Sequence, residues 1–296
     1  MTIALLLGCS ADLLPGESVL GVDVPMSVVL GEVGSELGSI VAWNGAAWAA
    51  AAPGAGEIWV DGEASGGDEP FAWVGWWGDR LARGGQAGVG VEGSDLPLLP
   101  GSLFAASAGG VFAWSDDEIR AWEGASAVLT GVVALAADES RVAARVCEDE
   151  CSVTSASLDL VEWQRASFSG ESTIGGLGGA VAFDNGAICV GDPELDLPDG
   201  AGSVSCDDGR LIEGETGDHL GQAIGGGFAA GTFNKWIVPP RARLVPLSGG
   251  EVLTLEVGAE NQPIRLAGDD ATLIVGSPFH PQDGLPAGAI FVVTHP

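Results

Sequence analysis

The chain has 296 residues, of which 46% are hydrophobic, so it can bury a sizeable core. Its 41 acidic and 11 basic residues give a formal net charge of −30, a surface that would repel nucleic acid and anionic lipid alike. Most apolar segments are short and end at Gly, Pro, Asp or Ser, which is typical of a protein made of many short strands.

The N-terminus opens with the apolar run Ile3–Leu7 and continues Gly8-Cys9-Ser10. This stretch resembles the lipobox of bacterial lipoproteins, whose cysteine becomes lipidated after cleavage. The resemblance implies that residues 1–17 are the remainder of a lipoprotein signal and a tether, with the lipid on Cys9. It also implies an outer-membrane location, because Ser10 stands where an inner-membrane retention signal has Asp. A buried N-terminal strand is the alternative, since the run is shorter than an ordinary signal.

An internal repeat follows along most of the chain. Its pattern is an apolar strand, a small residue two positions before Pro, a variable loop, Gly, and a second apolar strand. The clear copies are Ala49–Val60, Ile188–Cys206 and Leu273–Val293, and weaker ones are Leu103–Trp114 and Trp236–Leu255. Gly permits close backbone approach, and Pro ends the strand because it has no amide hydrogen.

A second signal is a bulky apolar residue followed by Gly. It occurs at Leu37-Gly38, Trp77-Gly78, Leu177-Gly178 and Leu220-Gly221. The period of about 40–50 residues is that of a four-stranded propeller blade. Counting on this period gives six copies, which begin near Gly34, Trp76, Ala127, Thr173, Thr216 and Gly258.

Together these motifs resemble the FG-GAP repeats of integrin-alpha-like proteins. The resemblance implies an all-β fold, a β-propeller of four-stranded blades. Six blades are favoured by the count, seven are possible, and a pair of β-sandwiches is the alternative. The last copy lacks an outer strand, and Ser18–Val33 has no partner of its own. We therefore expect one propeller domain over residues 18–296, closed by the N- and C-terminal strands.

Five cysteines are present, and four remain if Cys9 carries lipid. Cys147 and Cys151 bracket a short acidic turn, and Cys189 and Cys206 each end an apolar run. We predict disulfides Cys147–Cys151 and Cys189–Cys206, each across the same hairpin of neighbouring blades. Disulfides belong to oxidising compartments. Free structural thiols are the alternative.

Residues suited to chemistry are few. His219, His280 and His295 have no Cys or Ser partner at an informative spacing, so no catalytic residues or cofactor are predicted. The loop after Gly191 carries alternating carboxylates that could supply oxygens to Ca²⁺, namely Asp192, Glu194, Asp196 and Asp199. Calcium-binding FG-GAP repeats carry such a loop earlier in the blade, which favours a solvated acidic loop and no metal site.

We therefore predict a non-catalytic lipoprotein on the outer membrane or cell surface. It would act as a monomer, touch the membrane only through its lipid, and use a propeller face to bind a protein or glycan. The alternatives are a propeller-based hydrolase or lyase with a site at the central channel, and a structural envelope protein.

Overall fold

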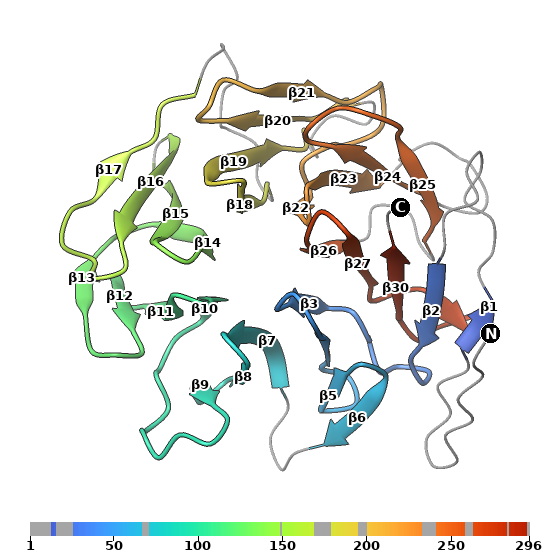
Figure 1. Ribbon diagram of the computed structural model, residues 1–296, viewed down its shortest axis with the longest axis horizontal. Helices are drawn as coiled ribbons and strands as arrows, with labels where there is room; N and C mark the ends of the chain where they lie inside the picture. The colour runs from blue at the N-terminus through green and yellow to red at the C-terminus, as the bar shows by residue number, and fades with distance from the viewer. Residues whose placement is uncertain are drawn as a thin grey trace.

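The structure is a computed structural model that describes residues 13–15, 26–66, 71–148, 150–168, 179–194, 200–232, 241–257, 263–282 and 284–294. Every regular element in these ranges is a β strand. No helix that could cross a membrane is found among them. The strands form small antiparallel sheets arranged as blades around a common axis (Figure 1).

Seven blades can be followed through the described ranges. Blade 1 consists of β3 (Ile40–Trp43), β4 (Trp48–Ala52), β5 (Glu57–Val60) and β6 (Glu63–Gly66). Blade 2 consists of β7 (Phe71–Trp77), β8 (Arg80–Gly85) and β9 (Gly88–Val91). Blade 3 consists of β10 (Leu103–Ser107), β11 (Gly110–Ser115), β12 (Glu118–Ala121) and β13 (Ser126–Val128). In blade 2, an isolated bridge between Val89 and Leu99 stands in the place of a fourth strand.

The later blades contain longer loops. Blade 4 consists of β14 (Val132–Ala137), β15 (Arg141–Cys147), β16 (Cys151–Ser157) and β17 (Gln164–Arg165). Blade 5 consists of β18 (Val181–Asp184), β19 (Ala187–Asp192), β20 (Ser203–Cys206) and β21 (Leu211–Glu213). Blade 6 consists of β22 (Ala223–Gly225), β23 (Phe228–Thr232), β24 (Arg241–Pro246) and β25 (Leu253–Glu256).

Blade 7 is built from both ends of the chain. Its strands, from the axis outward, are β26 (Arg265–Gly268), β27 (Thr272–Ser277), β30 (Ala289–Thr294), β2 (Met26–Leu30) and β1 (Leu13–Pro15). The loop that connects β27 to β30 forms a small separate hairpin of β28 (Pro281–Gln282) and β29 (Leu285–Pro286). The N-terminal β2 pairs with the C-terminal β30 over five residue pairs. This confirms the predicted closure of the ring by the two termini.

The closing strand is held from both sides. Side chains alternate between the two faces of a strand. Val28 and Leu30 accordingly enter an apolar cluster with residues of blade 6, while Val29 enters one with residues of blade 1. All three side chains are buried. The strand therefore joins blade 7 to both of its neighbours, and its loss would open the ring.

Small residues form most of the second strand of blade 1, which is packed between blades 7 and 2. Ala49, Ala50, Ala51 and Ala52 follow one another along β4 and are fully buried. A larger side chain at these positions would have to displace the next blade, because protein interiors are close-packed.

The two glycine signals meet in space at the junctions between blades. A Cβ placed on Gly38 would lie 2.7 Å from the Ala289 carbonyl oxygen and 2.9 Å from the Cα of Gly276. Gly221 meets Gly191 in the same manner. Gly191 and Gly276 are the glycines of Gly191-Asp192-Pro193 and Gly276-Ser277-Pro278. Leu-Gly of one blade thus packs against Gly-x-Pro of the preceding blade, and neither glycine has room for a side chain.

Part of the repeat register was wrong. Gly78 lies in the turn between β7 and β8, and nothing lies within 4 Å of a Cβ placed on it. Trp77-Gly78 is therefore no counterpart of Leu37-Gly38. The copy at Leu103–Trp114 covers the first and second strands of its blade, and Trp236–Leu255 extends over the third and fourth. The three clear copies do cover second and third strands.

The predicted all-β propeller is confirmed, and the alternative of two β-sandwiches is not what forms. The propeller has seven blades, the number that the sequence analysis gave as possible beside the favoured six. The first strands of blades 2, 3 and 4 begin at Phe71, Leu103 and Val132, only 32 and 29 residues apart. Those of blades 5, 6 and 7 begin 42 residues apart. The early blades use short turns, so a search at a period of about 40–50 residues merged blades 2 and 3.

Candidate functional site

Both predicted disulfides are present, and each joins the second and third strands of its blade. Cys147–Cys151 closes the β15–β16 turn, and Cys189–Cys206 crosslinks β19 to β20. Cys189 and Cys206 are fully buried, whereas Cys147 and Cys151 are partly exposed. The buried bond closes 17 residues, which stabilises the fold by about 3 kcal/mol on the chain-entropy model. Cys9 lies outside the described residues.

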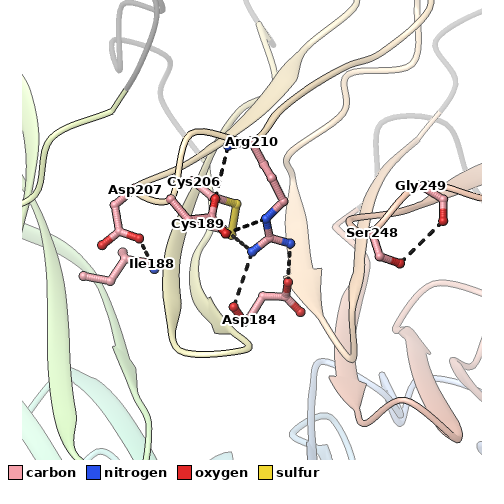
Figure 2. Close-up of polar contacts among 9 residues, drawn as sticks. Asp184, Ile188, Cys189, Cys206, Asp207, Arg210, Ser248 and Gly249 are labelled. Atoms are coloured by element: carbon pink, nitrogen blue, oxygen red, sulfur yellow. Dashed lines mark hydrogen bonds and ion pairs between the residues drawn. A yellow bond between two sulfur atoms is a disulfide. The ribbon is translucent and has the colours of Figure 1, made fainter.

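The Arg210 guanidinium lies beside the buried disulfide (Figure 2). It donates to the Asp184 carboxylate at 2.5 Å and to Asp208 at 2.7 Å, and its Nη2 lies 4.0 Å from Cys189 Sγ. Asp184 is only 8% exposed, so its charge requires this partner. Arg210 therefore compensates the buried charge of Asp184, and loss of Arg210 would leave that carboxylate buried without a partner.

The acidic loop is only partly described. Glu194 accepts hydrogen bonds from the backbone N–H groups of Ala201 and Gly202 at 3.0 and 3.2 Å, so its carboxylate holds its own loop together. Asp192 belongs to β19, and Asp196 and Asp199 lie outside the described residues. The calcium alternative therefore stays untested.

The histidines lie apart from one another. His219 is fully buried on the connection between blades 5 and 6, where its Nδ1 lies 3.0 Å from the Pro193 carbonyl oxygen. His280 stacks edge-on against Phe291 in blade 7. His295 lies outside the described residues. None of the sequence-predicted site residues in the described ranges lines the cavity around the axis.

That cavity is the central channel, with a volume of about 640 Å³. Residues of the first strands of all seven blades line it, from β3, β7, β10, β14, β18, β22 and β26. These strands surround the axis in Figure 1. The lining also includes residues from most of the turns between first and second strands, so the channel reaches that face of the propeller.

Most of the aromatic residues that line the channel belong to one sector of its wall. They come from three consecutive blades: Trp43 in blade 1, Trp73 and Trp76 in blade 2, and Phe104 in blade 3. Trp73 and Phe104 contact each other with ring centroids 5.5 Å apart. The lining from blades 4 to 7 is mostly small, with Ala136, Ala182, Gly225, Gly226 and Ala267, but it also includes Leu135 and Phe183.

Trp43 is fixed to a carboxylate of the adjoining blade 7. Its indole Nε1 donates to Asp269 Oδ2 at 2.8 Å, and Asp269 Oδ1 accepts from the backbone N–H groups of Ala271 and Thr272 at 2.9 Å. Partial burial tends to raise the pKa of Asp269, but these hydrogen bonds outweigh it and lower the pKa. The carboxylate is therefore ionised at neutral pH and held beside an aromatic ring.

The carboxylates near the channel mouth differ in whether a basic side chain lies close enough to compensate their charge. Asp138 Oδ2 lies 3.7 Å from an Arg141 nitrogen, and Asp184 is paired with Arg210. Asp269 and Glu139 have no Arg or Lys nitrogen within 4.0 Å among the described residues. They line the channel from blades 7 and 4, on opposite sides of the ring (Figure 1). The mouth thus carries net negative charge.

The sequence analysis assigned no residue of this sector to a site. Trp43, Trp73 and Trp76 pack in the apolar clusters between neighbouring blades and also border the channel. A partial signal was present, because Trp43 and Phe183 stand at or next to the ends of the first strands of their blades. Nothing in one hairpin reveals that the others converge on it.

Known proteins support the fold and nothing finer. No family model and no curated protein matches the chain. Among solved structures, a virginiamycin B lyase from Staphylococcus aureus matches with a TM-score of 0.54 and 9% identity, over 93% of this chain and 100% of that one. A chain of the mitotic checkpoint complex matches with a TM-score of 0.57 and 13% identity, over 100% of this chain and 99% of that one. The WD40 domain of Toxoplasma gondii coronin gives 0.52 and 12%, over 95% and 90%. At these identities the likeness establishes a β-propeller fold alone.

Proposed function

We propose that this protein is a non-catalytic, lipid-anchored protein of the cell envelope, a monomer that binds a ligand at the mouth of its central channel. The aromatic sector on a cavity of about 640 Å³ is the observation that carries the proposal. Aromatic walls with a few placed polar groups are typical of binding sites. The partner would be a protein or glycan, of which the mouth binds one exposed group.

A hydrolase or lyase at the same channel is the competing function. An enzyme of this kind needs an acid and a base near a reacting group. Among the described lining residues the acids are Asp138, Glu139 and Asp269, and none is His. Asp138 and Asp269 accept backbone hydrogen bonds in their own turns. This arrangement favours binding over proton transfer.

The repeat is, in our proposal, of the FG-GAP type. The contact of Leu37-Gly38 with Gly276 and that of Leu220-Gly221 with Gly191 support this assignment, because the same two motifs meet at two separate blade junctions. The partner class of such propellers then gives a reason to search for a protein or glycan ligand.

Adjacent tryptophans of β7 provide a test of the binding site. Trp76 lines the channel, whereas Trp77 is absent from the lining and stacks on Arg80 at 5.3 Å. A panel of oligosaccharides, organic cations, anions and neutral aromatic compounds is screened by thermal shift. We expect to find a compound that stabilises both the wild type and Trp77→Leu. Its affinity for Trp76→Leu should be at least about tenfold lower than its affinity for the wild type. Mass spectrometry should recover the compound unchanged. Equal binding by the two variants would reject the channel site, and conversion of the compound would favour the enzyme.

Lipidation at Cys9 is tested in cells. The gene is expressed in a bacterium with its upstream sequence, and membranes are separated from soluble fractions. We expect the wild type in the membrane fraction with incorporated labelled palmitate, and Cys9→Ala in the soluble fraction, because each buried CH₂ contributes about 0.8 kcal/mol to anchoring. A Cys9→Ala protein that stays on the membrane, or a wild type in the cytosol, removes the anchor from the proposal.

A further inference from the structure

We propose that the group bound at the channel mouth is an organic cation, an alkylammonium of the N-methylated kind. The site would be the aromatic sector of Trp43, Trp73, Trp76 and Phe104, bordered by Asp269. This inference rests on the proposed function, whose cavity it shares, and adds the chemical class of the ligand.

The wall chemistry favours a cation. An ammonium over the face of an indole ring is attracted by the ring quadrupole, and tryptophan is the strongest partner for such a contact. Trp43, Trp73 and Trp76 come from two neighbouring blades and are partly exposed on the channel. Each packs at a different blade junction, Trp43 between blades 7 and 1, Trp76 between blades 1 and 2 and Trp73 between blades 2 and 3, and each borders the same channel.

The propeller already uses this interaction at other aromatic rings. The Arg141 guanidinium lies over Phe183 at 5.1 Å from the ring centroid, and Arg83 lies over Phe71 at 5.9 Å. Phe183 also lines the channel, but its own arginine covers it. No such contact with an Arg or Lys is found for Trp43, Trp73, Trp76 or Phe104 in the described part of the chain. Those rings border the channel without a cation of the described chain over them.

Charge selects a cation over a neutral group. Asp269 lies beside Trp43 at hydrogen-bond distance and has no basic partner within 4.0 Å in the described ranges, and Glu139 adds a second uncompensated carboxylate. The formal net charge of −30 produces a field that draws cations and repels anions. An alkylammonium satisfies both features, because its methyl groups are apolar and its charge is spread over them.

Calorimetric titration with tetramethylammonium, choline and a trimethyl-lysine peptide tests the inference. The matched neutral probe is the carbon isostere of choline, in which a quaternary carbon replaces the nitrogen. We expect at least one cation to bind, its affinity to fall with added NaCl, and the isostere to bind at least about tenfold more weakly. The peptide arm distinguishes a group carried on protein from a free small molecule.

Two neighbouring carboxylates supply the matched variants. Asp269→Asn removes the charge and keeps one oxygen, which can accept either from Trp43 or from the turn, and we expect it to weaken cation binding about tenfold. Asp270→Asn removes a charge next to it that does not line the channel, and should leave binding within about twofold. Failure of all cations to bind, or equal binding of the isostere, overturns the inference. If oligosaccharides bind in a Trp76-dependent manner while cations do not, the proposed function stands and only the ligand class is wrong.

Discussion

Replacement of Val29 by Asp is expected to destabilise the propeller by about 4 kcal/mol or more, a large part of the stability of an ordinary domain. Val29 is 3% exposed, pairs with Ile290 and packs in the cluster shared with blade 1. An aspartate there would bury a charge without a partner. Ser27 lies on the same strand but is exposed, so Ser27→Asp should change the free energy of unfolding by less than about 0.5 kcal/mol. Urea titrations of the two variants give the comparison, and equal midpoints would contradict the closure role of β2.

Deletion of residues 1–30 extends this test to the whole closing strand. Within the described residues it removes the buried side chains of Val28, Val29 and Leu30, worth about 2 kcal/mol each, and it exposes the edge of β30. We expect loss of cooperative melting and a tendency to aggregate. A synthetic peptide of residues 18–33 added in trans should restore the melting transition. A deletion that melts like the wild type would show that the ring does not depend on its N-terminal strand.

Replacement of Gly38 by Ala should cost about 3 kcal/mol more than replacement of Gly45 by Ala. Both glycines have the left-handed backbone, with φ of 92° and 90°, so both variants pay a similar strain of about 1–2 kcal/mol. They differ in their surroundings. Nothing lies within 4 Å of a Cβ at Gly45, whereas a Cβ at Gly38 would press on the backbone of Ala289, Gly276 and Ser277.

The pair therefore isolates the contact between blades 1 and 7 from the backbone conformation. Free energies of unfolding from urea titration measure the difference, and Gly66→Ala, at a glycine with ordinary φ and open space, gives the baseline. Equal losses for Gly38→Ala and Gly45→Ala would mean that the Leu-Gly motif is needed only for its turn. A larger loss for Gly38→Ala would support the motif as the joint between blades.

Local sequence features fixed the strand class, the closure and the crosslinks. Gly, Pro and Asp at short intervals dictate turns, because they supply positive φ or remove a backbone donor, and the strands lie between them. The segment Ser18–Val33 belongs to no repeat copy, and the last copy lacks one strand. The sequence therefore predicted that this segment would supply the missing strand. Cys147 and Cys151 stand on either side of one turn, so their pairing followed from a hairpin alone.

The tertiary structure determined the blade count and the site. Blade length depends on the turns, and the short hairpins of blades 2 to 4 are not distinguishable from longer ones by strand composition. The channel wall is a sum over the whole ring: Trp43, Trp76 and Asp269 are far apart in the chain and meet only because seven first strands surround one axis. A pattern read along the chain records which residues share a strand. Which strands face one another is set by closure, a property of all the blades together.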